Sequence, residues 1–413
     1  MLLATLVTLG VGGAIKAPCA SAAWADGRQY RQLCYSDIVP LLGTEELTGN
    51  RLPYLDPCAG SAVCDEYPVA TMYFMRVAAW ISRGYVGFFW ANAAGLALCA
   101  LVTAWALYRM VGRRALLFAL SPTLALYGFM NWDLLAVMLA TLATLAFLRA
   151  RDRSSGILLG VGTAAKLYPA LFVPPFALDR LKGGRVRSAT VVAAWAAGTW
   201  LVLNGPFAVL RFGSWSEFFR FNATRGVDWD SLWFVACSHF GATASCTWPP
   251  QRIDPLALAI FAGLATIVWR VREARDPSFP RWTFGFPMLV LFLLANKVYS
   301  PQYSLWLLPW IALVEPGVGL FTAFSAAEVA VFLTRFTWFG TLMAEVGVAA
   351  YHGYHGATLR EFQIALLVRD AVLVAYLVTW TLRRGSLAPS PAGAPAAGAS
   401  EVEPAGTAAL PGP

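Results

Sequence analysis

The sequence predicts an all-α, polytopic membrane protein with about 12 membrane helices, some of them short and paired as broken hairpins. Hydrophobic residues make up 58% of the chain and charged residues only 13%, whereas a soluble domain usually carries about 25% charged residues. The formal charge of +8 is divided among short clusters between apolar stretches. The positive-inside rule explains this distribution better than nucleic-acid binding does, so we expect membrane lipids and no nucleic acid as partners.

Long apolar stretches define the straight spans. Five of them meet or nearly meet the roughly 20 residues that a bilayer requires: residues 88–112, 188–204, 255–272, 317–338 and 359–382. Residues 1–15 are apolar but short, and we favour an anchored first helix. Small residues at 19–23 also resemble a signal-peptidase site, and cleavage there is the alternative. Residues 67–85 predict a short, partly embedded segment on the outer side.

Basic clusters set the expected orientation. They comprise Arg109, Arg113 and Arg114; Arg149, Arg151 and Arg153; Arg180, Lys182, Arg185 and Arg187; Arg270, Arg272, Arg275 and Arg281; and Arg383 and Arg384. Placing all of them in the cytoplasm gives a consistent parity, with residues 16–66, 205–254 and 339–358 outside. Residues 1–384 then form one integral membrane domain. Residues 385–413 are rich in Pro, Ala and Gly, which predicts a disordered cytoplasmic tail.

Two apolar stretches are too short for two straight spans. Residues 155–179 and 283–314 each lie between cytoplasmic clusters, so the chain must enter the membrane and return. We expect a pair of short helices in each, with the turn at residues 165–169 in the first and 296–303 in the second. Broken helices are tolerated only where protein buries them or where they line a wet cavity.

Cysteines support this topology. Cys19, Cys34, Cys58 and Cys64 fall in the first outer loop and Cys237 and Cys246 in the second, whereas Cys99 lies within a helix. An oxidising compartment favours disulfides. Cys237 with Cys246 closes a short loop, and among three pairings of the other four we prefer Cys19 with Cys34 and Cys58 with Cys64. A metal site is the rival interpretation, but no Cys-x-x-Cys is present, and we expect neither a metal nor a cofactor.

Asp37, in "CYSDIVP", is the catalytic candidate. The first outer loop holds seven carboxylates, and most carboxylates in such loops are simply solvated. Asp37 differs because it follows a cysteine and an aromatic residue and precedes "IVP", an apolar run that we expect at the membrane surface. A carboxylate held beside apolar surface can act as a base on a sugar hydroxyl.

Lys166 and Lys297 are the second signal. A cation near the middle of a membrane costs about 2.5–3.5 kcal/mol on insertion scales, so it is usually functional or paired. Both lysines lie at hairpin turns where a phosphate could reach them, followed by Tyr168 in the first turn and by Gln302 and Tyr303 in the second. The alternative is that each lysine pairs with a carboxylate or extends to the membrane surface.

Two further motifs offer acceptor- or sugar-binding groups. "NWD" contributes Asn131 and Asp133 in a polar break between apolar runs, and "EYP" contributes Glu66 and Tyr67. The polar groups of "NWD" either hydrogen-bond a sugar or cap the helix that we expect to begin near Leu134.

The motifs "CYSDIVPLLGTEEL", "RLPYLD", "EYPV", "NWDLLAVMLA", "GVGTAAKLYPALFVPPF" and "NKVYSPQYSLWLLPW" occur in this order. The series resembles the bacterial polyprenyl-phosphate-mannose-dependent mannosyltransferases of the GT-C fold and, more distantly, is similar to the mannosyltransferase of GPI-anchor synthesis. This resemblance implies inverting transfer of a hexose, most often mannose, from a polyprenyl-phosphate donor to a lipid-linked or glycan acceptor on the outer face of the plasma membrane. On that pattern Asp37 is the base, and Lys166, Lys297, Gln302 and Tyr303 hold the donor.

The chemistry agrees with this reading, because a polyprenyl phosphate is a competent leaving group and the sequence has no Gly-rich nucleotide-binding motif. A membrane transporter or lipid flippase is the alternative, since transporters also use broken helices with charged turns. Transporters usually show paired internal repeats, and the first outer loop is not repeated in this chain. Arabinose or glucose as the donor sugar, and a phosphatidylinositol mannoside or a lipoglycan as the acceptor, remain open.

Overall fold

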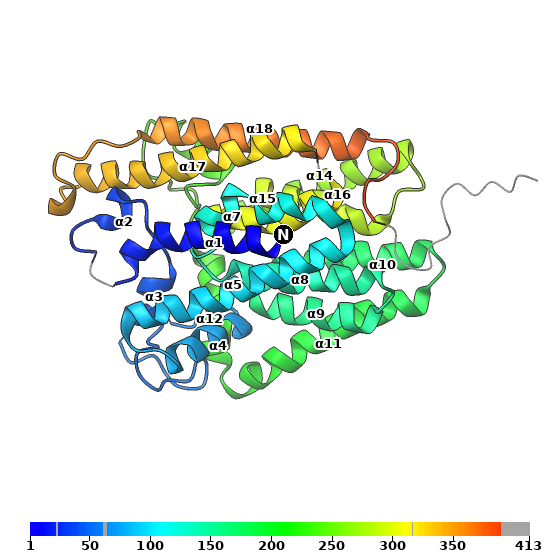
Figure 1. Cartoon of the computed structure of the whole chain (residues 1–413), viewed down its shortest axis with the longest axis horizontal. Helices are drawn as coiled ribbons and strands as arrows, with labels where there is room; N and C mark the ends of the chain where they lie inside the picture. Colours follow the sequence, from blue (N-terminus) through cyan, green and yellow to red (C-terminus); the bar gives the residue numbers. More distant parts are fainter. Residues whose placement is uncertain (22–23, 61–63, 316, 390–413) are drawn as a thin grey trace, which may run out of the picture.

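The computed structural model describes residues 1–21, 24–60, 64–315 and 317–389. Within these residues the chain is helical with no strand, and most helices run along the long axis of one bundle (Figure 1). Six helical stretches there are long and apolar enough to cross a membrane. The prediction of an all-α, multi-pass membrane protein is therefore confirmed.

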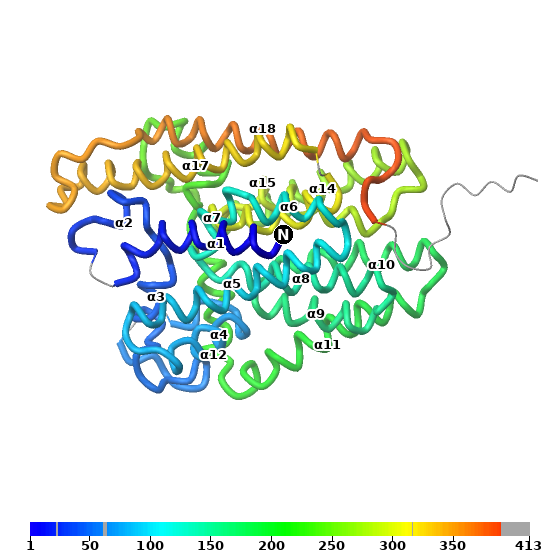
Figure 2. Tube along the Cα trace, in the orientation of Figure 1, coloured from blue at the N-terminus to red at the C-terminus, as the bar shows by residue number. Residues whose placement is uncertain are grey.

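The long stretches contain α1 (Leu2–Lys16), α5 (Gly84–Val111), α11 (Val186–Leu210), α14 (Pro250–Arg275), α17 (Val318–Glu345) and α18 (Leu359–Leu382). Shorter segments fill the spaces between them: α6 (Leu116–Ala119) with α7 (Pro122–Tyr127), α8 (Asp133–Leu148), α9 (Asp152–Ala165), α10 (Val173–Lys182), α15 (Gly285–Ala295) and α16 (Leu307–Val314). Together they agree with the expected number of membrane segments. The chain can be followed in Figure 2, where α1 runs beside α7 and α5, against which it packs.

The basic clusters gather at one end of the bundle, on the right in Figure 1. The contacts that join them run from Arg180 to Asp152, from Lys182 to the carbonyl of Pro277, from Arg272 to the carbonyl of Trp380 and from Arg114 to the carbonyl of Leu387. This common position agrees with the expectation that all five basic clusters lie on the same side of the membrane. That this end faces the cytoplasm stays a prediction, and residues 390–413 of the predicted tail lie outside the described part of the chain.

The opposite end carries the long connections and is called the loop end below. It holds α2 (Arg28–Arg31), α3 (Ile38–Thr44), α4 (Val69–Trp80), α12 (Phe212–Thr224) and α13 (Leu232–Cys237). Three disulfides lie there and join the pairs favoured from the sequence, which are Cys19–Cys34, Cys58–Cys64 and Cys237–Cys246. Cys58 and Cys64 lie beside Asp65 in a group that could otherwise hold a metal, but their sulfur atoms are bonded to each other.

The two broken hairpins have their turns at the loop end. The first rises as α9, turns after Ala165 and returns as α10, so that Arg180 pairs with Asp152 at 2.7 Å. The second rises as α15, turns through the 3₁₀ helix Pro301–Trp306 and returns as α16. Both hairpins are as expected, and they place Lys166 and Lys297 beside the long loops.

Groups at the loop end donate hydrogen bonds to the carbonyl groups that the breaks leave unpaired. Thr71 Oγ1 donates to the Ala165 carbonyl at 2.7 Å, and Trp233 Nε1 donates to the Ala295 carbonyl at 2.8 Å. The backbone N–H of Asp228 bonds the Lys297 carbonyl at 2.9 Å. An unsatisfied carbonyl at this depth would cost several kcal/mol, so these contacts permit helices to end inside the bundle.

Two glycines bring the first hairpin against α11. A Cβ atom on Gly156 would lie 2.6 Å from the Val192 carbonyl oxygen, and one on Gly160 would lie 2.6 Å from that of Ala196. No real side chain tolerates such distances. Small residues four positions apart let membrane helices approach closely, because dispersion contacts rather than the hydrophobic effect hold helices together in lipid.

We therefore expect Gly160→Val to force α9 away from α11 and to destabilise the protein by about 1–3 kcal/mol. Thermal unfolding of the purified protein in detergent measures this as a lower melting temperature. Gly263→Val on α14 is the matched control, because nothing lies within 4 Å of the added Cβ atom. Equal melting temperatures for the two variants would contradict the packing argument.

Candidate active site

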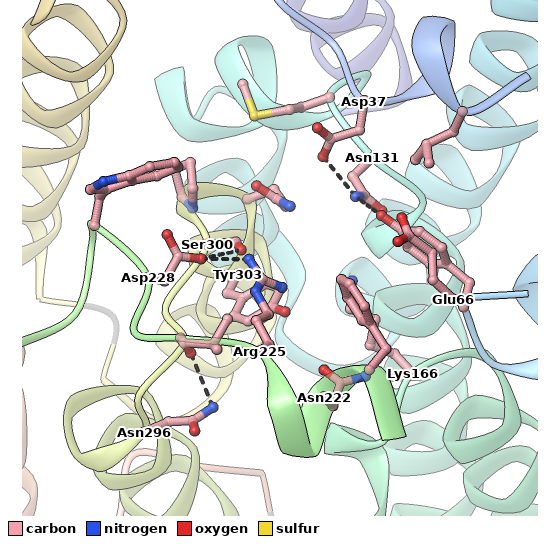
Figure 3. Close-up of a pocket in the computed structure, with 18 of the residues that line it drawn as sticks. Asp37, Glu66, Asn131, Lys166, Asn222, Arg225, Asp228, Asn296, Ser300 and Tyr303 are labelled. Atoms are coloured by element: carbon pink, nitrogen blue, oxygen red, sulfur yellow. Dashed lines mark hydrogen bonds and ion pairs between the residues drawn. The ribbon is translucent and has the colours of Figure 1, made fainter. Parts of the chain in front are cut away.

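A cavity of about 1130 Å³ lies at the loop end, between the first loop and the two hairpin turns. Ligand sites for small molecules usually measure about 300–1,000 Å³, so this cavity has room for more than one small ligand. Figure 3 shows Asp37, Asn131 and Glu66 on one side, with Asp228 and Ser300 across from them.

Nine of the sequence-predicted site residues line this cavity: Asp37, Glu66, Tyr67, Asn131, Lys166, Tyr168, Lys297, Gln302 and Tyr303. Asp133 does not line it. Residues from five separate parts of the sequence thus converge on one space. What each residue does to a substrate stays a prediction at this point.

Asp37 is held from both sides. Its Oδ1 accepts a hydrogen bond from Tyr35 Oη at 2.7 Å, and its Oδ2 accepts one from Asn131 Nδ2 at 2.8 Å. Its backbone N–H bonds the Met130 carbonyl at 2.8 Å, and the neighbouring Ser36 hydroxyl bonds that of Phe129. A carboxylate has about four acceptor positions, so both oxygens retain capacity for a substrate hydroxyl.

The Asn131 amide connects Asp37 to the neighbouring phenol. Its Nδ2 also donates to Tyr67 Oη at 2.7 Å. The cap residue of α8 is Trp132, whose side chain does not cap the helix. Asn131 Oδ1 accepts the backbone N–H of Trp132 at 2.6 Å, whereas the oxygens of Asp133 bond Trp306 and Lys166. Asn131 therefore bonds the backbone where α8 begins as well as Asp37, whereas Asp133 does not cap the helix.

Lys166 is paired as well as exposed to the cavity. Its ammonium lies 3.2 Å from Asp133 Oδ1, and that same oxygen accepts the indole N–H of Trp306 at 2.7 Å. Asp133 is fully buried, whereas 16% of the Lys166 side chain is accessible. A lysine has three N–H donors, so one carboxylate does not exhaust its capacity. Asp133 is placed to hold Lys166 rather than to contact a sugar.

Aromatic stacking joins the two hairpin turns. Trp306 lies between Tyr168 and Tyr303, with both pairs of ring centroids 4.1 Å apart. The Lys166 ammonium lies 5.0 Å from the centre of the Tyr303 ring. Tyr168 is almost entirely buried by this stack, so most of its ring supports the site rather than facing the cavity.

Lys297 has its own carboxylate partner. Its ammonium lies 2.9 Å from Asp254 Oδ2 and 3.4 Å from the Ala223 carbonyl. Pairing with a carboxylate, the alternative that the sequence left open, therefore applies to both lysines. Both also line the cavity, so pairing and substrate contact do not exclude one another here.

Arg225 and Asp228 also line the cavity, although neither was predicted as a site residue from the sequence. Arg225 pairs with Asp228 at 2.9 Å, and 34% of its side chain is accessible, so it is more exposed than either cavity lysine. Asp228 also accepts the Ser300 hydroxyl at 3.0 Å, which ties this loop to the second hairpin turn. The signal in the sequence was "TRGVDWD", three charges within an aromatic outer loop.

Two glutamates on the Asp37 side have raised pKa values. Burial raises the pKa of Glu66, and the negative charge of Asp37 adds to this effect, while Arg225 opposes it. Burial and then the charge of Glu66 raise the pKa of Glu45 to about 8. Glu45 lies behind the cavity wall, where its Oε2 accepts the backbone N–H of Asp65 at 2.6 Å.

The model of glycosyltransferase family 87 matches residues 66–296. No curated protein matches the chain. Among solved structures, the chain is similar to ArnT from Cupriavidus metallidurans bound to undecaprenyl phosphate, with 13% identity, a TM-score of 0.47 and coverage of 92% of this chain and 77% of that one. The chain is also similar to ArnT from Cupriavidus metallidurans in the apo state, with 14% identity, a TM-score of 0.40 and coverage of 77% of this chain and 67% of that one.

The Glu45 carboxyl should make stability depend on pH. Its pKa rises from an ordinary 4.5 to about 8 on folding, so the folded state binds more protons than the unfolded state between these values. The stabilisation is complete below about pH 4.5, the ordinary value, and is lost as the pH rises through about 8. We expect the melting temperature in detergent to fall between pH 5 and pH 8.

Glu45→Gln should remove most of that decrease, because the amide mimics the protonated acid and keeps an oxygen for the Asp65 N–H. Glu345→Gln, at an exposed position near the end of α17, is the control and should keep the wild-type profile. A decrease of the same size in Glu45→Gln would assign the pH dependence to other groups.

Proposed function

The chain belongs to glycosyltransferase family 87. We propose that it transfers mannose, a hexose, from a polyprenyl-phosphate donor to the hydroxyl group of an acceptor, and that this occurs on the outer face of the plasma membrane. The acceptor is a lipid-linked sugar or a glycan, and the anomeric configuration inverts. One observation carries the proposal: the Asp37 carboxylate and the Lys166 ammonium line the same cavity.

In this mechanism Asp37 is the general base. The acceptor oxygen attacks the anomeric carbon as its proton passes to Asp37, the bond from that carbon to the phosphate oxygen breaks, and polyprenyl phosphate leaves with the bonding electrons. Proton transfer to a positioned carboxylate contributes typically 10²–10⁴-fold to such a rate. The Tyr35 and Asn131 hydrogen bonds fix the carboxylate for this role.

Two cations that line the cavity suit the leaving phosphate. Lys166 and Arg225 both line it, and each retains N–H donors beyond those that its own carboxylate uses. Preformed donors stabilise developing charge without reorganisation. We assign the donor phosphate to Lys166 and Arg225, and Lys297, Gln302 and Tyr303 to the neighbouring part of the donor.

The cavity wall also offers a route for a prenyl chain. Phe218 and Phe221 of α12 and Phe292 of α15 line the cavity. No residue of α12 is fully buried, and large apolar side chains of α11 and α14 are exposed beside it. A donor with a lipid tail can place its phosphate in the cavity and its chain among these apolar groups. Family membership favours this transfer over the transporter or flippase alternative.

Asp37→Asn should lower the rate of transfer at least 100-fold, because the amide cannot accept the acceptor proton. The assay is transfer of radiolabelled mannose from polyprenyl-phosphate-mannose in membranes, with the protein level measured in parallel. Asp56→Asn, in the same loop and outside the cavity lining, should transfer normally. Full activity of Asp37→Asn at a normal protein level would overturn the assignment of the base.

Lys166→Met should lower kcat/KM for the donor by about 10–100-fold, because it removes positive charge from the leaving phosphate. Steady-state kinetics with varied polyprenyl-phosphate-mannose measures this value. Lys182→Met is the matched control, since Lys182 bonds the Pro277 carbonyl at the basic end of the bundle. If both variants used the donor as the wild type does, Lys166 would not belong to the phosphate site.

A further inference from the structure

Four aromatic rings cover one wall of the cavity, and the mechanism above leaves three of them without a role. They belong to Tyr35, Tyr30, Phe339 and Trp229. Ring centroids lie 6.0 Å apart for Tyr35 and Tyr30, 5.4 Å for Tyr30 and Phe339, and 5.1 Å for Phe339 and Trp229. These rings form a continuous surface, called the aromatic wall below, and Trp229 is 40% exposed although it is a large apolar residue.

The aromatic wall ends at the Asp37 carboxylate. Tyr35, its first member, donates its hydroxyl to Asp37 Oδ1 at 2.7 Å. The last member, Trp229, adjoins Asp228 on the opposite side of the cavity. A molecule that lies on the aromatic wall therefore has an edge near the Asp37 carboxylate.

Charges around the aromatic wall disfavour an anion. Within the described residues neither Asp37 nor Glu66 has a cation within 4.0 Å, so neither carboxylate has an ion-pair partner. The cations that line the cavity each have one: Lys166 with Asp133, Arg225 with Asp228, Lys297 with Asp254 and Arg335 with Asp230. The buried ammonium of Lys16 bonds the Tyr35 carbonyl and does not line the cavity. Among the carboxylates that line the cavity, Asp37 and Glu66 are thus the two without an ion-pair partner among the described residues.

Aromatic faces combined with carboxylate acceptors suit a neutral sugar ring. The C–H groups on one face of a pyranose pack against aromatic faces, which carry partial negative charge. Its hydroxyl groups can donate to nearby carboxylates, and a few placed polar groups in an otherwise apolar pocket fix the orientation. A phosphate or a uronic acid in the same place would be repelled by Asp37 and Glu66.

We propose that the aromatic wall is the acceptor subsite and that it holds an uncharged pyranose, with the attacking hydroxyl directed at Asp37. This inference rests on the proposed function and adds the class of acceptor to it. A free glycan and the headgroup of a glycolipid share this chemistry. The prenyl chain of the donor is the competing occupant of these rings.

The test uses the full-length protein in detergent with polyprenyl-phosphate-mannose and octyl α-mannopyranoside as the acceptor. Trp229→Ala should raise the KM for the acceptor about tenfold, the value expected for the loss of a stacked aromatic contact. The KM for the donor and kcat should stay as in the wild type. Trp229→Phe keeps an aromatic face and should restore most of the acceptor affinity, which a purely structural role would not predict.

Trp248→Ala is the matched control. Trp248 lies at the same end of the bundle, is 42% exposed and contacts Trp233, but it does not line the cavity. Its kinetics should equal those of the wild type. Comparing methyl α-mannopyranoside with octyl α-mannopyranoside as acceptors distinguishes a free glycan from a glycolipid. Equal use of the two indicates a free glycan, and a strong preference for the octyl glycoside indicates a glycolipid.

In the kinetic assays, three results would overturn the inference: an unchanged acceptor KM in Trp229→Ala, a raised donor KM in its place, or equal use of octyl β-glucuronide and octyl α-mannopyranoside. The second result would assign the rings to the prenyl chain. If the enzyme transferred mannose to membrane acceptors but not to the octyl mannoside, the inference about the acceptor subsite would be wrong and the proposed function would stand. Absence of transfer to either acceptor would sink the proposed function.

Discussion

The fully buried Asp133 carboxylate organises the centre of this molecule. One of its oxygens bonds the indole of Trp306 in the second hairpin, and the Lys166 ammonium of the first hairpin lies against the same carboxylate. A lone charge of either sign at this depth would be expensive, and removing one partner of a buried pair leaves the other uncompensated. The pair therefore fixes where the two broken hairpins meet, and the stack of Tyr168, Trp306 and Tyr303 fills the space around it.

The short turn before α8 connects this pair to Asp37. Asn131 holds the Asp37 carboxylate, and Asp133, two residues further on, holds Lys166. Trp132 between them anchors the turn to α5 through a 2.7 Å hydrogen bond to Asn92. The relative position of the proposed base and the proposed phosphate-binding cation is thus set by three consecutive residues.

Much of the fold could be predicted because membrane insertion imposes strong rules on sequence. Apolar length identified the long spans, and the positions of arginine clusters required the two hairpins before any contact was known. Lys166 and Lys297 were found because a lysine in an apolar stretch is unusual. Arg225, Asp228 and Trp229 were missed for the opposite reason: charged and aromatic residues are ordinary in an outer loop, so nothing in the sequence distinguished them.

The amino-acid sequence alone established an all-helical membrane protein, the two broken hairpins and a short set of polar residues that an apolar environment makes costly. The tertiary structure decided which of those residues face a common cavity and which hold the cavity residues in place. Asp133 and Asn131 belong to one motif and were given one role, yet the first is buried behind Lys166 and the second contacts Asp37. The reason is geometric: hydropathy and charge are properties of single residues, whereas a hydrogen-bond partner exists only once distant segments pack together.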